Sequence, residues 1–81
     1  MAKTLVVVFG ASGFIGRCIV QKLVGRGFRV RAAVRRPEQA LFLKSMGAVG
    51  DVSLVQADVC SELSVMAAID GASIVVNAVG I

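Results

Sequence analysis

A glycine-rich turn between an apolar run and a helical pattern constrains the fold of this 81-residue chain most strongly. Residues 5–9 are continuously apolar and mostly β-branched, which is typical of a strand covered on both faces. The segment from Gly10 to Gly13 interrupts that run. Residues 14–24 then favour an amphipathic helix that ends at Gly25 and buries a stripe comprising Phe14, Ile15, Cys18, Ile19 and Leu23.

Apolar runs and helical patterns alternate through the rest of the chain. Strands are predicted over residues 28–34, 51–57 and 73–79, and helices over residues 37–46 and from the cap Ser61 to Gly71. Such alternation with short connections predicts an α/β fold, β-α-β-α-β-α-β, with a parallel sheet and right-handed crossovers. A partial Rossmann, or doubly wound, sheet of this kind has the strand order 3-2-1-4.

The last predicted strand lies at an edge of that sheet. Its apolar residues 74–76 make it an aggregation-prone edge unless something covers it. We therefore expect residues 1–81 to be the N-terminal half of a Rossmann domain. The missing C-terminal part of that domain is then the first expected partner of this chain.

Composition excludes several kinds of chemistry. The chain is 57% hydrophobic and only 17% charged, and it has no His, Tyr or Trp. Ser-His-Asp and Cys-His catalysis, His-bearing metal sites and proton transfer by Tyr therefore cannot be built from it. Cys18 and Cys60 form no C-x-x-C motif and are predicted to be reduced thiols packed in the core. No catalytic residue and no metal ligand is predicted.

Targeting signals and charge bear on location and partners. Neither a signal peptide nor an apolar run long enough to span a membrane is predicted, so a cytoplasmic location is expected. All but one of the nine Lys and Arg residues lie in residues 1–36, and all five Asp and Glu residues follow. A basic half suits a nucleic acid, an anionic lipid or a phosphate-bearing ligand. The predicted sheet offers no aromatic platform for stacking bases, and Arg29 and Arg31 suit a solvated strand face, so no nucleic-acid partner is expected.

The turn itself has the spacing G-x-x-G-x-x-G. Gly10 permits a tight turn, Gly13 leaves room for a pyrophosphate beside the backbone, and Gly16 lets the helix pack closely on the sheet. Free N–H groups at the helix start then hold the phosphates. The motif predicts a dinucleotide site formed by Gly10, Ser12, Gly13, Phe14, Ile15 and Gly16; the alternative is a glycine-rich turn without a ligand.

The end of the second predicted strand decides the type of cofactor. An NAD site places an Asp or Glu there to accept from the ribose 2′-OH, whereas this chain has Arg35 and Arg36. A guanidinium cannot accept that hydrogen bond but can bind a 2′-phosphate, so NADP(H) is the preferred cofactor, with NAD(H) as the alternative. Arg17 is a second candidate phosphate neighbour. Arginines that are merely solvated at a loop are the competing interpretation.

Four segments carry a resemblance to a known family. Residues 7–17 (VVFGASGFIGR), 35–37 (RRP), 56–59 (QADV) and 75–81 (VVNAVGI) resemble the extended and atypical short-chain dehydrogenase/reductases. The second and last segments are most similar to bacterial relatives of the dehydrogenase-like accessory subunit of respiratory complex I, proteins of the NAD-dependent epimerase/dehydratase type. The resemblance implies an NAD(P)-binding Rossmann domain.

The resemblance also implies roles for individual residues. Asp58 would accept from the adenine amino group and Val59 would pack on the adenine ring, with an ordinary loop carboxylate as the alternative for Asp58. The segment of Asn77, Ala78, Val79 and Gly80 would line the ribose and nicotinamide. Enzymes of this superfamily use Tyr-x-x-x-Lys with a Ser or Thr, and these residues would lie beyond residue 81.

Two functions therefore remain open. The chain is either the NADP(H)-binding part of a protein whose nucleotide has a structural or regulatory role, or the cofactor half of an active reductase or nucleotide-sugar epimerase/dehydratase. In the first case the resemblance implies a membrane-bound respiratory complex as partner, and a peripheral place at the inner membrane.

Overall fold

Four parallel strands form the centre of the molecule, in the order β3-β2-β1-β4. The computed structural model describes residues 3–48 and 50–79. Its elements are β1 (Leu5–Phe9), α1 (Phe14–Gly25), β2 (Arg29–Val34), the 3₁₀ helices η1 (Pro37–Gln39) and η2 (Leu41–Met46), β3 (Val52–Gln56), α2 (Glu62–Ile69) and β4 (Ile74–Asn77). The α/β class and the strand order 3-2-1-4 are confirmed.

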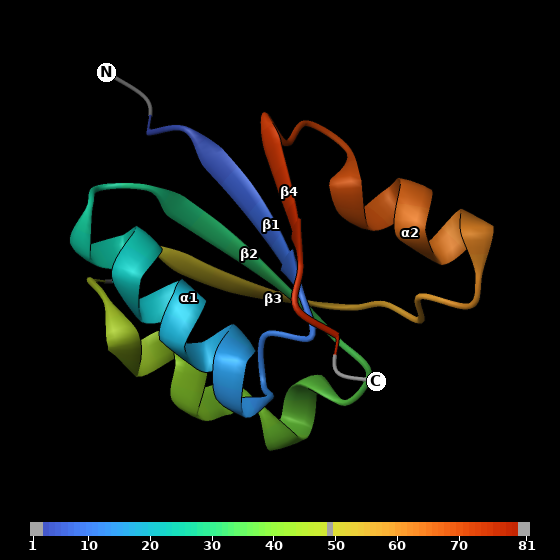
Figure 1. Cartoon of the computed structure of the whole chain (residues 1–81), viewed down its shortest axis with the longest axis horizontal. Coiled ribbons are helices and arrows are strands. Elements are labelled where there is room, and N and C mark those ends of the chain that lie inside the picture. Colours follow the sequence, from blue (N-terminus) through green and yellow to red (C-terminus); the bar gives the residue numbers. More distant parts are fainter. Residues whose placement is uncertain (1–2, 49, 80–81) are drawn as a thin grey trace.

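Helical segments cover both faces of the sheet. α1 and η2 lie on one face and α2 on the other (Figure 1). The central strand β1 is accordingly buried on both sides: Val6 and Val8 pack with Val20 and Leu43, whereas Val7 packs with Ala68. The alternation of inward and outward Cβ atoms along a strand explains how consecutive valines serve two cores.

The segment after β2 differs from the prediction. The helix expected over residues 37–46 is two short 3₁₀ helices that meet at Ala40. The Ala40 N–H donates to the Pro37 carbonyl and the Leu43 N–H donates to the Ala40 carbonyl, both at 3.0 Å. Residues three apart share one side of a 3₁₀ helix, so this tighter winding buries Ala40 and Leu43 together against the sheet.

The buried face of α1 also differs from the prediction. Gly16 and Val20 are buried, whereas Phe14 is 80% exposed, Ile15 is 65% exposed and Cys18 lies at the surface. Gly16 packs so closely on the Gly10 carbonyl that an added Cβ would overlap it. That contact turns the Gly16 side of the helix toward the sheet. Ile19 and Leu23 of the predicted stripe pack against the core as predicted, whereas Phe14, Ile15 and Cys18 face solvent.

Three further side-chain predictions can be compared with the structure. Cys60 is exposed like Cys18, so the prediction of core thiols was wrong; Cys18 lies on the outer face of α1 and Cys60 in the turn before α2. Arg31 is not solvated as predicted, because its Nη1 donates to the Ala68 and Asp70 carbonyls, both at 2.7 Å. Arg29 is exposed as predicted.

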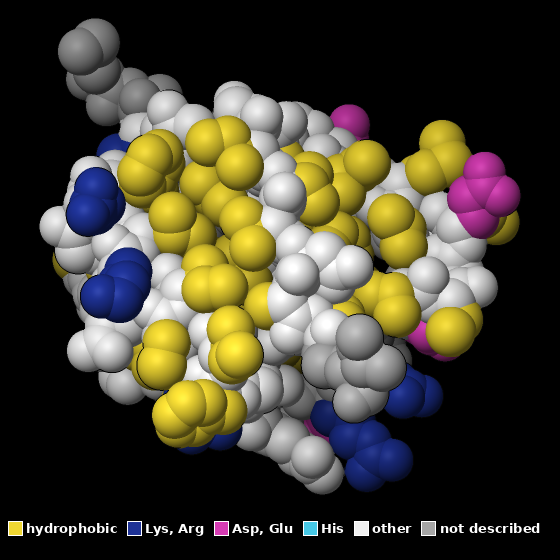
Figure 2. All heavy atoms as spheres, in the orientation of Figure 1, with side chains coloured by type: hydrophobic (Ala, Val, Ile, Leu, Met, Phe, Trp, Pro, Cys, Tyr) yellow, Lys and Arg dark blue, Asp and Glu magenta, His cyan; other side chains and the backbone are white. Residues whose placement is uncertain are grey.

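The edge strand β4 is uncovered in the described part of the chain. Ile74 is 44% exposed and Val75 is 49% exposed. Hydrophobic side chains gather over the face that α1 and β4 share (Figure 2). The prediction of an apolar edge strand at this position is confirmed.

Candidate functional site

A cleft of about 630 Å³ lies at the carboxyl ends of β1, β2 and β3. Ligands of open parallel α/β sheets bind at this edge, beside the strand where the order reverses. β1 is that strand, because the chain continues from it to β2 on one side and β4 lies on the other. The predicted site residues that line the cleft are Gly10, Ser12, Arg35, Arg36, Asp58, Val59 and Val79.

The glycine turn forms one wall of the cleft. Gly10 has φ +74°, a conformation that favours glycine, and its N–H donates to the Ala33 carbonyl at 3.1 Å. A Cβ on Gly10 would lie 2.8 Å from the backbone nitrogen of Val79. The segment after β4 therefore supports the turn from behind, and the Ala78 N–H also donates to the Phe9 carbonyl at 2.8 Å.

The three glycines of the motif are required for different reasons. A Cβ on Gly16 would lie 2.8 Å from Ala11 Cα as well as overlapping the Gly10 carbonyl, so the fold itself needs glycine there. A Cβ on Gly13 would meet only the Gly10 carbonyl oxygen, at an ordinary 3.5 Å. Gly13 also has φ −72° and ψ 172°, which any residue adopts. Nothing in the fold therefore demands glycine at residue 13, and the space around an added Cβ is otherwise open within 4 Å.

The start of α1 offers unpaired donors to the same space. Gly13 is the N-cap, and it supplies no side chain to accept from the first helical N–H groups. Among the described residues, the N–H groups of Phe14 and Ile15 have no backbone or side-chain acceptor. Together with the positive end of the helix dipole, such donors favour an anion.

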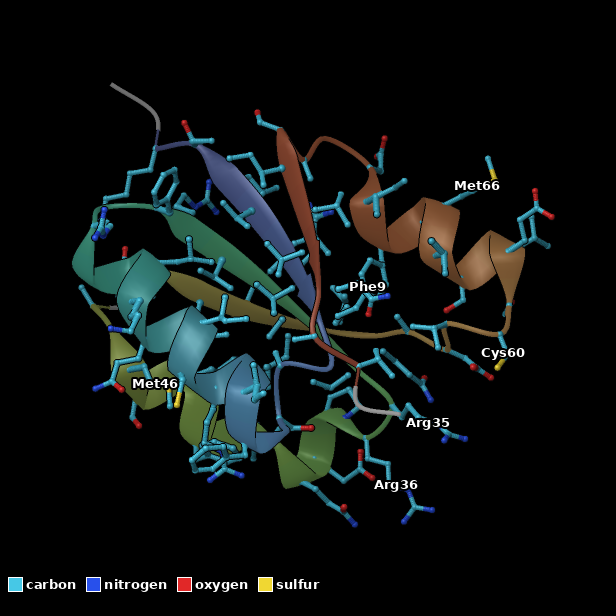
Figure 3. All side chains as sticks on the ribbon, in the orientation of Figure 1. Phe9, Arg35, Arg36, Met46, Cys60 and Met66 are labelled. Carbon is cyan, nitrogen blue, oxygen red and sulfur yellow. The ribbon has the colours of Figure 1, made fainter. Side chains whose placement is uncertain are left out.

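Arginines form the wall opposite the turn. Arg35 and Arg36 project from the loop after β2 on the side of the molecule where Cys60 also lies (Figure 3). Arg17 from α1 lines the cleft as well. In residues 3–48 and 50–79 the only ion pair joins Lys3 and Asp51, so none of these three guanidinium groups is neutralised by a carboxylate there.

Asp58 and Val59 lie at the end of β3. The Asp58 Oδ1 accepts from the Cys60 N–H at 2.9 Å, and the Asp58 N–H donates to Ser64 Oγ at 2.9 Å. The bond from Cys60 holds one carboxylate oxygen and the bond to Ser64 holds the backbone, while no hydrogen bond within the described residues uses the second carboxylate oxygen. Val59 is exposed and presents an apolar surface to the cleft. A smaller hollow of about 380 Å³ adjoins the cleft and shares Arg35, Arg36 and Asp58 with it.

The remaining predicted site residues border the turn without lining the cleft. Gly13, Phe14, Ile15 and Gly16 form the turn and the helix start. The Asn77 Oδ1 accepts from the Val79 N–H at 3.1 Å, so this side chain braces its own loop. Gly80 lies outside the described residues.

Several residues of the cleft were absent from the sequence prediction: Ala33, Val34, Gln39, Phe42, Ala57 and Cys60. The rule that ligands bind at strand carboxyl ends could have found Val34 and Ala57, which end β2 and follow β3. Gln39 and Phe42 had no such signal, since their positions depend on the 3₁₀ winding of residues 37–46. No three His, Cys, Asp or Glu side chains of the described ranges cluster closely enough to hold a metal ion.

Comparisons with known proteins identify the family of the chain. Residues 10–81 match the model of a family described as NAD(P)H-binding. Cinnamoyl-CoA reductase 1 of Oryza sativa subsp. japonica is 43% identical over 72 residues, which are 85% of this chain and 21% of the reductase. The mitochondrial NADH dehydrogenase [ubiquinone] 1 alpha subcomplex subunit 9 of Arabidopsis thaliana is 39% identical over 74 residues, 90% of this chain and 18% of that protein.

Solved structures show the same architecture. The crystal structure of vestitone reductase from alfalfa (Medicago sativa) has a TM-score of 0.81 and 30% identity, and the match covers 93% of this chain and 24% of that one. The chain thus spans about a fifth of the two curated relatives described above, 21% and 18%. No helix in the part that the structure describes has the length and hydrophobicity to cross a membrane. These matches confirm the predicted resemblance, and because the family model covers nearly the whole chain, the chain belongs to the NAD(P)H-binding family.

Proposed function

We propose that the cleft binds NADP(H) in preference to NAD(H). One observation carries the proposal: the loop after β2 presents Arg35 and Arg36 to the cleft where an NAD site would present a carboxylate. A guanidinium attracts a 2′-phosphate and can donate to two of its oxygens at once. A neutral 2′-OH gains no comparable interaction from the guanidinium. The family membership supports the coarser part, a nicotinamide dinucleotide; the preference for the 2′-phosphorylated form is our proposal.

The other predicted residues have matching roles in this proposal. The diphosphate lies beside Gly10 and Gly13 and accepts from the free N–H groups at the start of α1, with Ser12 at the cleft wall. Asp58 accepts from the adenine amino group with its free oxygen, and Val59 packs on the adenine ring.

The nicotinamide end of the cofactor contacts the segment after β4 in this proposal. Asn77, Ala78 and Val79 line the nicotinamide ribose through their backbone, because the Asn77 side chain is engaged in its own loop. The bound nicotinamide would supply hydride transfer. The residues of this chain bind and orient the cofactor and include no Tyr that could move a proton with the hydride.

For the biological role we infer a structural or regulatory use of the nucleotide, in a larger protein of which residues 1–81 form the N-terminal half of the Rossmann domain. The complex I subunit among the relatives supports this role, with a respiratory complex as partner and a peripheral place at the membrane. The reductases among the relatives support the second candidate, an active oxidoreductase. Assays of the whole gene product with NADPH and aldehyde or nucleotide-sugar substrates separate the two. Turnover establishes the enzyme, whereas retained nucleotide without turnover supports the structural role.

Calorimetric titration of the chain with NADP⁺ and NAD⁺ tests the cofactor proposal. We expect NADP⁺ to bind more tightly, and Arg35→Gln and Arg36→Gln each to weaken NADP⁺ by about tenfold, the loss of one charge-assisted contact, with little effect on NAD⁺. Arg26→Gln is the control, because Arg26 carries the same charge at the far end of α1 and does not line the cleft. Equal or tighter binding of NAD⁺ to the unmodified chain would exclude the proposed preference.

A further inference from the structure

We propose that Arg17, held in place by Phe42, is a positioning residue for the phosphate-binding turn. The inference rests on the proposed dinucleotide site and adds to it a pair of residues from α1 and η2. Arg17 Nη2 donates to the Ser12 carbonyl at 3.0 Å and Nε to the Gly13 carbonyl at 3.4 Å. Arg17 Cζ lies 4.9 Å from the centre of the Phe42 ring. Both side chains line the cleft.

The stability of α1 does not explain an arginine at residue 17. The residue lies in the first turn of the helix, where the helix dipole disfavours a cation, and that turn contains no acidic side chain. No carboxylate of the described residues pairs with it. A residue that breaks a local rule without compensation inside its own element often serves a site. The acceptors that Arg17 does have are the two carbonyls of the glycine turn.

Those two hydrogen bonds act on the peptide planes that carry the N–H groups of the turn. The C=O and N–H of one trans peptide are coplanar and point in opposite directions. The Ser12 carbonyl shares its peptide plane with the Gly13 N–H, and the Gly13 carbonyl shares its plane with the Phe14 N–H. The Arg17 side chain therefore braces both planes from the carbonyl side. Among the described residues it alone holds the Ser12 carbonyl, whereas at the Gly13 carbonyl it adds to the bond from the Arg17 N–H at 2.9 Å. The Gly13 N–H is in turn held by the Gly10 carbonyl at 3.1 Å, which leaves the Phe14 N–H as an oriented free donor.

Phe42 restricts the orientations that the Arg17 guanidinium can adopt beside the glycine turn. A long exposed arginine otherwise samples many rotamers, and stacking on an aromatic ring at this distance restricts them. Phe42 belongs to η2, which follows Arg35 and Arg36 and packs against the same face of the sheet as α1. The pair therefore joins the 3₁₀ segment on one side of the cleft to the turn on the other.

The roles of charge and of positioning are separated by titrating variants with NADP⁺ and NAD⁺. We expect Arg17→Ala to weaken both nucleotides by about tenfold, the loss of a charge-assisted bond, and to leave their affinity ratio unchanged. Arg17→Lys keeps the charge but not the two-carbonyl fork, so we expect it to behave like Arg17→Ala. We expect Phe42→Leu to weaken the binding of both nucleotides by about threefold, and Phe42→Tyr to bind them nearly as well as the unmodified chain. In the Arg17→Ala background, we expect Phe42→Leu to cause no further loss of affinity. Arg26→Ala at the C-cap of α1 and Leu41→Ala in η2 are the controls, because neither residue lines the cleft.

Amide hydrogen exchange of the nucleotide-free chain gives a second readout. We expect the Gly13 amide, which is bonded to the Gly10 carbonyl, to exchange faster in Arg17→Ala and unchanged in Arg26→Ala. A loss confined to NADP⁺, full rescue by Arg17→Lys, additive effects of the two substitutions, or unchanged exchange at Gly13 would each overturn the positioning role. If the unmodified chain binds neither nucleotide, the proposed function fails instead, and the exchange measurement still decides whether Arg17 orders the turn.

Discussion

At the scale of single residues, the glycines of the G-x-x-G-x-x-G motif are needed for different reasons. The backbone of Gly13 is extended and its neighbourhood is open, so its lack of a side chain serves the space beside the turn. We expect Gly13→Val to abolish dinucleotide binding, because the side chain would occupy the pyrophosphate path, while the free energy of unfolding changes by about 1 kcal/mol or less. Calorimetry and urea denaturation measure the two effects. Unchanged affinity in the folded variant would contradict the placement of the diphosphate.

Gly16 provides the opposite case within the same motif. An added Cβ there overlaps the Gly10 carbonyl and crowds Ala11, both in backbone that cannot move without opening the turn. We expect Gly16→Ala to lower the free energy of unfolding by about 1–3 kcal/mol, the range for overpacking, in the absence of any nucleotide. Urea denaturation of the ligand-free chain measures this. A Gly16→Ala chain as stable as the unmodified one would show that the helix can retreat from the turn.

At the scale of elements, both ends of α2 are held by side chains. Ser61 Oγ accepts from the Ser64 N–H at 3.3 Å at the start, and Arg31 from β2 donates to two carbonyls at the end. We expect Arg31→Met, which keeps the apolar stem, to lower the free energy of unfolding by about 1–2 kcal/mol through loss of these bonds and of a cation at a helix C-terminus. Arg29→Met on the same strand is the control and should change stability by less than about 0.5 kcal/mol. Equal effects of the two variants would remove Arg31 from this role.

We expect the stability of the fold to depend on pH through Asp51, which lies just before β3 and pairs with Lys3 before β1. The hydrogen bond from Lys3 Nζ at 2.9 Å, helped by the Ala48 N–H, holds the pKa of Asp51 below its ordinary value. A carboxyl with a lowered folded pKa stabilises the fold above its unfolded pKa of about 3.9, and this contribution disappears as the pH falls through the folded value. We expect Lys3→Met to raise the pKa of Asp51 and to lower stability at neutral pH, with the difference from the unmodified chain closing in acid. Denaturation across a pH series checks this; Lys44→Met is the control, and a difference independent of pH would contradict the assignment.

At the scale of the whole molecule, the sheet has a core on each face and two edge strands, β3 and β4. β4 presents an apolar edge strand, and such edges pair with other chains unless they are covered. We expect the isolated chain to associate with increasing concentration in sedimentation experiments, and Val75→Lys to reduce that association. Ser53→Lys adds the same charge to the opposite edge strand, β3, and should have a smaller effect. A chain that stays monomeric throughout would show that the β4 edge needs no cover.

Local patterns in the sequence were enough to predict the four strands, their order, the glycine turn between β1 and α1, and the cap at Ser61. These features depend on neighbouring residues: the apolar period of a strand, the φ that Gly10 must adopt, and the fixed handedness of a parallel crossover. The close packing of Gly16 on the sheet was predicted, but the tertiary structure decided that Phe14, Ile15 and Cys18 are exposed. It also decided the 3₁₀ winding that buries Ala40 with Leu43, the bonds of Arg31 to α2, and the meeting of Arg17 with Phe42. Each of these outcomes depends on how an element packs against the sheet or against another element, and propensities that act over a few residues carry no information about such packing.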